Sequence, residues 1–372
     1  MTTPAKQLKK DRSTGGAARL WALAALLLAV FWGSFFLGRY GVSLTLGQFL
    51  GLMAEGLQRV LTALVNWAGK PFGFATERLF AVPVTWSSVM ETIVLNIRMP
   101  RIIMACLVGC CLASAGACYQ GVFQNPMAAP DLLGASTGAC FGAALAILHG
   151  RSSAIITLYA FFFSLLTVLL VFVIGQRAPG QKTVNLILAG IMVSSLFSAG
   201  TSYIKLVADP GSKLPEITYW LMGSLSSIKP RDVLFLVIPV TLGLVPLLIL
   251  SWRMNLLTLG EEEARSMGVN TRLLRFTVIL CATLLTAASV AVSGMIGWVG
   301  LVIPHFCRML FGYDYRRLIP AAALFGASFL IIVDDIARLA TAGEIPLGIL
   351  TAFVGAPIFL YLILTGGARR GN

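Results

Sequence analysis

Ten long apolar runs dominate this chain and constrain its fold more than any other feature. Short polar connections separate nine of these runs from one another, and one longer connection follows the first run. A helix that crosses the hydrocarbon core of a bilayer needs about 20 predominantly apolar residues, and most of the runs reach that length. The pattern predicts an all-α integral membrane protein with about ten transmembrane helices and both termini on one side. The runs lie at about 18–37, 99–118, 132–149, 153–175, 184–206, 232–252, 273–295, 297–310, 318–337 and 346–366.

Two of these runs, 132–149 and 297–310, are short for a helix that crosses lipid alone. Backbone at membrane depth is tolerated in such segments when protein surrounds them. The first of the two is rich in Gly, Ala and Ser (LLGASTGACFGAAL, 132–145), which favours close helix packing. We therefore expect both short runs to lie inside the bundle.

The composition agrees with a polytopic membrane protein. The chain is 58% hydrophobic and 12% charged, whereas soluble domains average roughly 25% charged residues. The net charge of +13 does not indicate a nucleic-acid partner, because the basic residues form no long cationic run. The seven cysteines all lie in apolar runs without CxxC spacing, so we interpret them as small hydrophobic residues and predict no metal site.

The order of polar and apolar segments predicts four regions. Residues 1–17 form a basic cytoplasmic tail, 18–37 a first transmembrane helix, 38–97 a periplasmic connection and 98–368 a core of about nine spans. The connection has leucine and valine residues at helical spacing within 47–68, which indicates a helix on the outer surface. These residues are Leu50, Leu57, Val60, Leu61 and Leu64.

The positions of the basic residues predict the orientation. If the N-terminus is inside, the short inner connections are richer in Lys and Arg than the short outer ones. Cytoplasmic loops carry this excess in membrane proteins, and long connections such as 38–97 count for less. We therefore place both termini, and the polar stretch 253–270, in the cytoplasm.

The stretch 253–270 (RMNLLTLGEEEARSMGVN) is the longest polar interruption in the C-terminal half. Three consecutive carboxylates, Glu261 to Glu263, suit the positive end of a short helix, and Arg265 lies near its negative end. Gly268 can adopt the left-handed conformation that ends a helix, and Glu261 is spaced to pair with Arg265. The stretch is either a simple connector between two spans or a docking element for a cytoplasmic partner.

The rest of the chain favours the docking element, because the chain carries no energy source of its own. It has no GxxxxGK[ST] phosphate-binding loop. The centres of the spans are nearly free of the ionisable residues on which ion-coupled carriers depend. A secondary transporter with a cytoplasmic regulatory helix remains the alternative. A membrane enzyme is less favoured, because no loop combines a nucleophile, an acid–base pair or a metal triad.

Several long runs of residues resemble one family. They are IRMPRIIMACLVGCCLASAGACYQGVFQNPMAAPDLLGASTGA at 97–139, LILAGIMVSSLFSAGTSYI at 186–204, LPEITYWLMGSLSS at 214–227, and most of 256–360 from LLTLGEEEARSMGV to VGAPIFL. These runs are similar to the permease subunits of ABC importers for iron-siderophores, haem and vitamin B12, the FecCD type. The resemblance covers about 97–366. Apart from the first span, residues 1–96 do not share it, and their outer connection is longer than is usual in the family.

The resemblance implies a fold like that of the vitamin B12 importer permease and a homodimer with the transport path on its two-fold axis. Two cytoplasmic ABC ATPase subunits would bind below and a periplasmic substrate-binding protein above. The chain would be no enzyme and would bind no cofactor, because the ATPase partners use the ATP and Mg. It would lie in the inner membrane and carry a metal chelate, with iron(III)-siderophore as first choice and cobalamin or haem next.

The resemblance also assigns residues. The segment that would dock in a cleft of the ATPase consists of Gly260, Glu261, Glu262, Glu263, Ala264, Arg265, Ser266, Met267 and Gly268. Arg98, Arg101 and Arg338 match residues that hold acidic groups of the binding protein. The alternative for these arginines is anchoring at the membrane interface, and we favour docking.

The inner end of the path has candidate residues as well. Asn125, Met127 and Thr183 match positions that narrow the cytoplasmic exit in the family, which typically has leucine where Met127 stands. Ordinary turn chemistry is the alternative for Asn125, because Asn-Pro often initiates turns. Gly294, Gly297 and Gly300 recur at every third residue, and we interpret them as sites of tight helix crossing rather than ligand contact.

Overall fold

The computed structural model describes residues 4–38, 45–70, 76–258, 260–341 and 343–368, and within them every regular element is helical. The elements are α1 (Pro4–Ser34), α2 (Leu46–Gly69), α3 (Ser88–Glu91), the π-helix η2 (Thr92–Arg98), α4 (Met99–Val122), the 3-10 helix η3 (Pro130–Leu133), α5 (Ala135–Leu148), α6 (Ser153–Arg177), α7 (Lys182–Val207), α8 (Lys213–Leu221), α9 (Pro230–Leu257), α10 (Glu261–Ser266), α11 (Thr271–Ser293), α12 (Val299–Phe311), α13 (Tyr315–Leu339) and α14 (Leu347–Ala368).

The ten predicted apolar runs all lie on helices. Seven helical segments are long and apolar enough to cross a membrane: 16–34, 88–122, 153–177, 182–207, 230–257, 271–293 and 315–339. Three shorter apolar helical segments, at 135–148, 299–311 and 347–361, correspond to the remaining runs. The predicted all-α membrane architecture is confirmed, with ten as an approximate number of spans.

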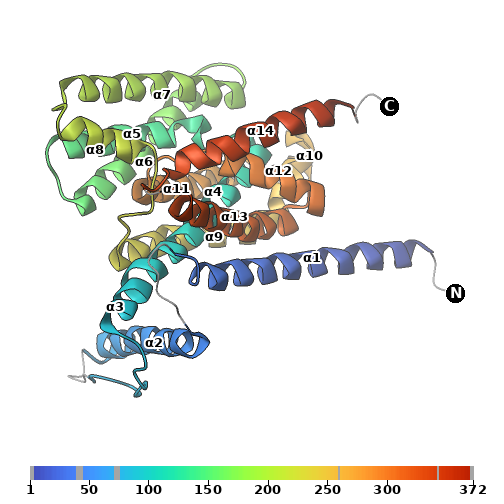
Figure 1. The fold of residues 1–372 in the computed structure, drawn as a ribbon. Coiled ribbons are helices and arrows are strands. Elements are labelled where there is room, and N and C mark those ends of the chain that lie inside the picture. The colour runs from blue at the N-terminus through green and yellow to red at the C-terminus, as the bar shows by residue number, and fades with distance from the viewer. Residues whose placement is uncertain (1–3, 39–44, 71–75, 259, 342, 369–372) are drawn as a thin grey trace.

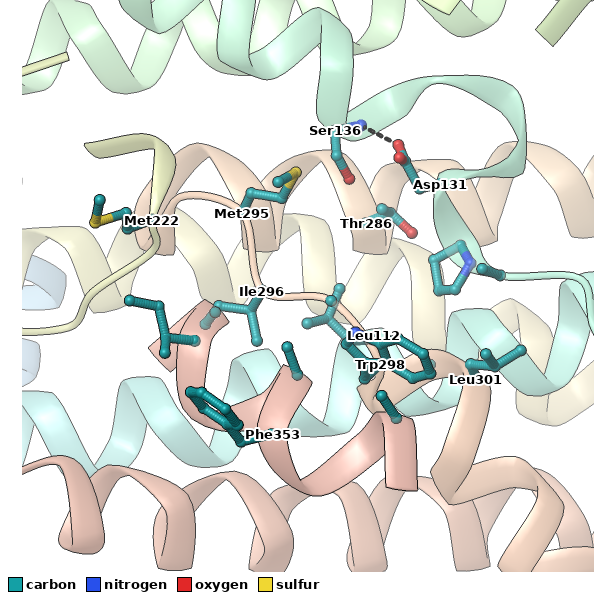
Figure 2. A pocket seen from close by; sticks show the side chains of 18 of the residues that line it. Leu112, Asp131, Ser136, Met222, Thr286, Met295, Ile296, Trp298, Leu301 and Phe353 are labelled. Atoms are coloured by element: carbon teal, nitrogen blue, oxygen red, sulfur yellow. Dashed lines mark hydrogen bonds between the residues drawn. The ribbon is translucent and has the colours of Figure 1, made fainter. Parts of the chain in front are cut away.

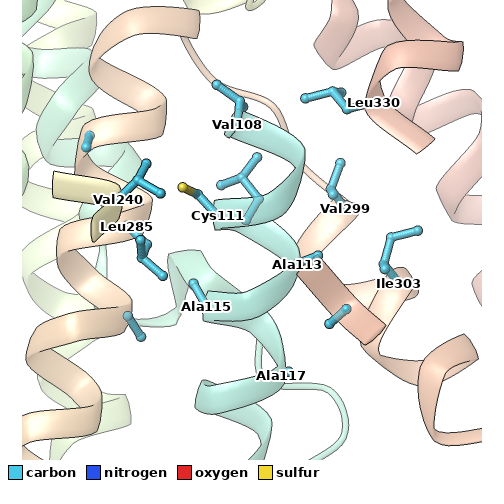
Figure 3. Close-up of a cluster of buried hydrophobic side chains, with 14 of the residues drawn as sticks. Val108, Cys111, Ala113, Ala115, Ala117, Val240, Leu285, Val299, Ile303 and Leu330 are labelled. Carbon is cyan, nitrogen blue, oxygen red and sulfur yellow. The ribbon is translucent and has the colours of Figure 1, made fainter. Parts of the chain in front are cut away.

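Helix α4 lies at the centre of the bundle. Its small side chains, including Ala113, Ala115 and Ala117, are completely buried. Figure 3 shows α4 between Val240 and Leu285 on one side and Val299, Ile303 and Leu330 on the other. These five residues come from α9, α11, α12 and α13, so α4 joins the two halves of the core.

Glycines let α4 approach its neighbours to backbone contact. A Cβ at Gly116 would lie 1.8 Å from the carbonyl oxygen of Gly300 on α12. A Cβ at Gly109 would lie 2.2 Å from the carbonyl oxygen of Gly326 on α13. Membrane helices associate through such close contacts, because lipid provides no hydrophobic drive between them.

The short helix α5 packs closely against α6, as the small residues of 132–145 predict. A Cβ at Gly138 would lie 2.6 Å from the carbonyl oxygen of Phe163, and one at Gly142 would lie 2.4 Å from that of Tyr159. The other short helix, α12, packs on α4 and α13. Protein therefore covers both short helices extensively, as expected for backbone that does not span lipid alone.

The N-terminal region differs in part from the expectation. Helix α1 already begins at Pro4, so much of the expected polar tail continues the first span as helix. Helix α2 covers the segment where a surface helix is expected, and Thr45 and Gln48 form a capping box at its start. Phe49 and Leu52 of α2 are buried together with the polar Glu55 and Gln58, whereas the predicted apolar stripe is exposed at Leu50, Leu57, Val60 and Leu61.

The described ends of the chain lie at one end of the bundle. Figure 1 shows the beginning of α1, the end of α14 and the short helix α10 at the same end, with α3 and α8 at the opposite one. An even number of crossings produces this arrangement. The prediction that both termini and the 253–270 stretch share one side agrees with it.

Candidate functional site

Helix α10 is a short, rigidly ended helix on the surface of the bundle. The N–H of Val269 donates to the carbonyl of Ala264 (3.1 Å), and the N–H of Gly268 donates to that of Arg265 (2.9 Å). These two bonds form a Schellman motif. Gly268 has φ +79°, which confirms the predicted left-handed stop. The end of α10 is therefore fixed by backbone geometry.

The start of α10 also depends on a glycine. Gly260 has φ +130°, and a Cβ there would lie 2.2 Å from Oε2 of Glu263, which folds back over the helix start. Ala264 is completely buried, whereas Glu262, Ser266 and Met267 are exposed. The side chain of Glu261 lies outside the described residues, so its predicted pair with Arg265 stays a prediction. Helix α10 thus packs against the rest of the bundle through Ala264 and exposes an acidic face to solvent.

Hydrogen bonds fix the helix ends around α10. Asn270 accepts from the N–H of Leu273 (3.0 Å) and caps α11. Asn255, near the end of α9, donates to Asp314 Oδ1 (2.7 Å) and accepts from the N–H of Tyr315 (2.8 Å). Burial acts to raise the pKa of Asp314, but the bond from Asn255, the N–H of Arg316 and the charge of Arg316 outweigh it and hold that pKa below its ordinary value. The α9 end is therefore joined to the α13 start by a carboxylate that is ionised at neutral pH.

The three arginines expected to dock a binding protein are buried within this chain. Arg98, Arg101 and Arg338 are 4%, 6% and 8% exposed. Arg101 forms an ion pair with Asp334, and its Nε lies 3.0 Å from both carboxylate oxygens. Its Nη1 donates to Glu344 Oε1 at 2.8 Å. Arg338 pairs with Asp335 and lies with its Nε 3.3 Å from Asp334 Oδ2. In this chain the three guanidinium groups therefore contact groups of the chain itself, and their docking to a binding protein stays a prediction.

The same network holds the end of the first span. Arg98 Nη1 donates to the carbonyl of Phe35 (2.6 Å), and Arg338 Nη1 donates to that of Leu37 (3.3 Å). Ser34 donates to Asp335 Oδ1 (2.6 Å) and accepts from Arg338 Nη2 (2.9 Å). The last carbonyls of a helix have no partner within it. Arg98 and Arg338 supply donors to two carbonyls just beyond the end of α1 and so connect it to η2 and α13.

The inner-gate candidates are only partly brought together. The side chain of Asn125 accepts from the N–H of Met127 (2.9 Å), which is the turn chemistry considered as its alternative role. Met127 is 52% exposed. Thr183 lies in the first turn of α7 and lines a cleft that also includes Gly260 and Arg265. The cleft therefore connects one gate candidate with the α10 region.

A cavity of about 760 Å³ lies where the chain is interrupted between α11 and α12. Figure 2 shows Met222, Met295, Ile296, Trp298 and Phe353 around it, with Asp131, Ser136 and Thr286 supplying polar groups. Asp131 Oδ1 accepts from the N–H of Ser136 at 2.9 Å and so caps α5. No Lys, Arg or His is among the described residues that line the cavity.

The segment between α11 and α12 forms part of this cavity wall. Trp298 has φ +69°, a left-handed conformation that bulky residues seldom adopt. Gly294 approaches α8, because a Cβ there would lie 2.3 Å from the carbonyl oxygen of Trp220. Non-helical backbone at membrane depth typically lines a cavity.

The three regularly spaced glycines have different environments. Gly294 and Gly300 lie in close contacts, as predicted for a helix crossing, whereas Gly297 faces open space and lines the cavity. No sequence pattern used above indicated the residues that line the cavity. The glycine repeat at the start of a short apolar run was the available signal for a broken helix.

Known proteins of similar sequence share one type of function. The family model of the FecCD transport family matches residues 42–365. The molybdate import system permease protein MolB of Haemophilus influenzae is 41% identical over 290 residues, which cover 76% of this chain and 85% of that protein. The cobalamin import system permease protein BtuC of Halobacterium salinarum is 39% identical, with 82% and 81% covered. Others are named for an iron chelatin and for hemin.

A solved structure is similar across nearly the whole chain. It is described as an inward-facing conformation of a metal-chelate type ABC transporter, and it is 35% identical with a TM-score of 0.79. The match covers 94% of this chain and 99% of that one. On the sequence and the fold together, the chain belongs to the FecCD transport family.

Proposed function

We propose that this chain is the permease subunit of a binding-protein-dependent ABC importer that carries a metal chelate across the inner membrane. ATP hydrolysis in partner subunits drives the transport. The observation that carries the proposal is α10, a six-residue acidic helix fixed between α9 and α11 at the end of the bundle where α1 begins. Such a helix offers a soluble partner a rigid contact that is continuous with two long apolar helices.

We place this end of the bundle in the cytoplasm, with both termini there, because the short connections on that side are rich in Lys and Arg. Two ATPase subunits, which use ATP and Mg, would bind α10 over Gly260–Gly268. The permease itself would bind no cofactor. A homodimer would place the transport path between two copies, with Asn125, Met127 and Thr183 near its cytoplasmic exit.

The cavity supports a chelate as cargo. Its wall has two methionines and two aromatic rings, and Asp131 is the one charged side chain among its described lining residues. A bare oxyanion such as molybdate would find no cationic donor on this wall, whereas the apolar surface of a chelate would be complementary to it. Relatives are named for iron chelatin, cobalamin and hemin. Among these cargoes, iron(III)-siderophore is our first choice.

Docking of the binding protein at Arg98, Arg101 and Arg338 stays part of the proposal, with one structural condition. Glu344 is the most exposed acid of the network, with 34% of its side chain accessible. An acidic group of the binding protein would therefore replace Glu344 at Arg101 Nη1, while Asp334 keeps its contact with the rest of that guanidinium.

The test is transport in proteoliposomes that contain the permease, its ATPase and its binding protein. Glu262→Lys on the exposed face of α10 is expected to reduce ATP-driven uptake at least tenfold while the complex still inserts and the ATPase still hydrolyses ATP. Glu216→Lys on α8, at the opposite end of the bundle, serves as the charge-matched control. Normal uptake by the Glu262 variant would contradict the role of α10. Uptake driven by a proton gradient without the ATPase would instead indicate a secondary transporter.

A further inference from the structure

A second cleft, of about 980 Å³, lies between the α6–α7 connection and the beginning of α11. Four basic residues line it: Lys182, Arg265, Arg272 and Arg275. No Asp or Glu is among the described residues that line it. These four side chains make the described lining of the cleft strongly positive, which is complementary to an anionic group.

The N-terminus of α7 adds to the positive potential of the cleft. Gln181 precedes this 26-residue helix and makes no side-chain cap. The N–H groups of the first turn, which includes Thr183, therefore carry the positive end of the helix dipole without a capping acceptor from Gln181. Lys182 Nζ donates to the carbonyls of Gln176 (2.8 Å) and Ala178 (3.1 Å), which holds the ammonium group beside the end of α6.

The other end of the cleft is apolar. Phe172, Leu186, Phe276 and Ile279 line it, and the rings of Phe172 and Phe276 lie with their centroids 5.1 Å apart. Arg272 and Ile279 are seven residues apart on α11, which corresponds to about 10 Å along the helix axis. The ligand that fits this cleft has an anionic head and an apolar chain, in that order along α11.

We propose that this cleft binds an acidic phospholipid. The phosphate of the lipid lies among Lys182, Arg272 and Arg275, and an acyl chain follows Phe276 and Ile279 toward the bilayer centre. Basic pockets between transmembrane helices on the cytoplasmic side are suited to such head groups. The placement at the inner leaflet rests on the proposed orientation. Inorganic phosphate has the same charged group as the lipid head but no acyl chain to contact the apolar end of the cleft.

The position of the cleft gives the lipid a role in transport. Gly260 and Arg265 of the α10 region line the cleft on one side, and Thr183 lines it on the other. A bound lipid therefore contacts both the proposed site of ATPase docking and a residue of the proposed gate. Its anionic head group stabilises the arrangement in which these two regions are close together.

The test uses the full-length chain purified in a neutral detergent, with native mass spectrometry and thermal unfolding as readouts. Phosphatidylglycerol is expected to remain bound and to raise the unfolding temperature, whereas phosphatidylcholine and inorganic phosphate are not. The double variant Lys182→Gln/Arg272→Gln should weaken phosphatidylglycerol binding roughly thirtyfold, since each basic side chain near an anionic head group contributes about a fivefold factor. The charge-matched control is Arg177→Gln/Arg253→Gln, whose side chains are exposed outside the cleft.

A second variant separates lipid from phosphate. Phe276→Ser should weaken binding of phosphatidylglycerol and leave the response to inorganic phosphate unchanged. Equal stabilisation by inorganic phosphate would indicate a small-anion site and overturn the proposal, as would an equal loss of lipid binding in the control. Neither readout requires the ATPase, the binding protein or nucleotide. A negative result therefore leaves the proposed transport function standing, and failed transport leaves the lipid site standing.

Discussion

At the scale of single residues, the buried ionic network is the most constrained feature of this molecule. Arg98, Arg101 and Arg338 carry three positive charges, and Asp334, Asp335 and Glu344 carry three negative ones, so the group is neutral as a whole. Removing one partner of a buried pair is costly, because the other charge stays in a medium that solvates it poorly.

We expect Asp334→Ala to destabilise the protein by about 3–5 kcal/mol, because it leaves Arg101 without its buried carboxylate. Glu344→Ala removes a partly exposed partner of the same arginine and should cost less than about 1 kcal/mol. Thermal unfolding of the two purified variants in the same detergent measures the difference. Equal unfolding temperatures would contradict the view that Asp334 holds the network together.

The sequence contained the members of this network but not their pairing. Arg98 and Arg101 lie three residues apart in the sequence, and Asp334 and Asp335 are adjacent near the end of a predicted span. The contacts of Arg101 with Asp334 and Glu344 join residues more than 200 positions apart, which no local pattern encodes. Local backbone chemistry, by contrast, was predictable at Gly268, because a helix stop needs only its own neighbours.

At the scale of elements, the lengths and positions of the apolar runs were sufficient to predict nearly every span, including the two short helices α5 and α12. They could not predict that 294–298 would be an irregular segment lining a cavity, because the glycines there are equally compatible with helix crossing. They also missed the early start of α1 at Pro4. A polar sequence with few helix breakers does not by itself distinguish a tail from an extended helix.

The α4–α12 crossing provides a test of element packing. Gly116→Ala places a methyl group where only 1.8 Å separates it from the carbonyl of Gly300. Backbone must move to accept it, so we expect a loss of stability of about 1–3 kcal/mol. Gly33→Ala on α1, where a Cβ meets nothing within 4 Å, controls for the gain in helix propensity. If the Gly116 variant unfolds at or above the wild-type temperature, α4 and α12 can move apart without loss of stability, and the expectation is wrong.

At the scale of the whole molecule, the fold places the α10 region and the α8 region at opposite ends of the bundle. The membership of a transport family and the ten apolar helices both indicate that the chain passes repeatedly through the membrane. The architecture was therefore predictable from sequence. The contact between two copies in the proposed homodimer was not, because residues of such an interface have the same apolar character as lipid-facing residues.

Cysteine labelling of intact cells tests the orientation of the whole molecule. A membrane-impermeant maleimide is expected to label Gly211→Cys, next to α8, without permeabilisation. It should label Ser266→Cys on α10 only after the inner membrane is opened. The parent chain supplies the background, since five of its seven cysteines are buried and Cys106 and Cys110 are partly covered. The reverse labelling pattern would invert the proposed topology.

Helix α11 runs without a break from the connection that follows α10 to the irregular segment 294–298 at the cavity. Its 23 residues correspond to about 34 Å. If the Asn270 end is the pivot, a tilt of roughly five degrees swings the Ser293 end through an arc of about 3 Å. A small tilt at the cytoplasmic end proposed for α11 is thus large enough, at its other end, to resize the space available to a cargo molecule.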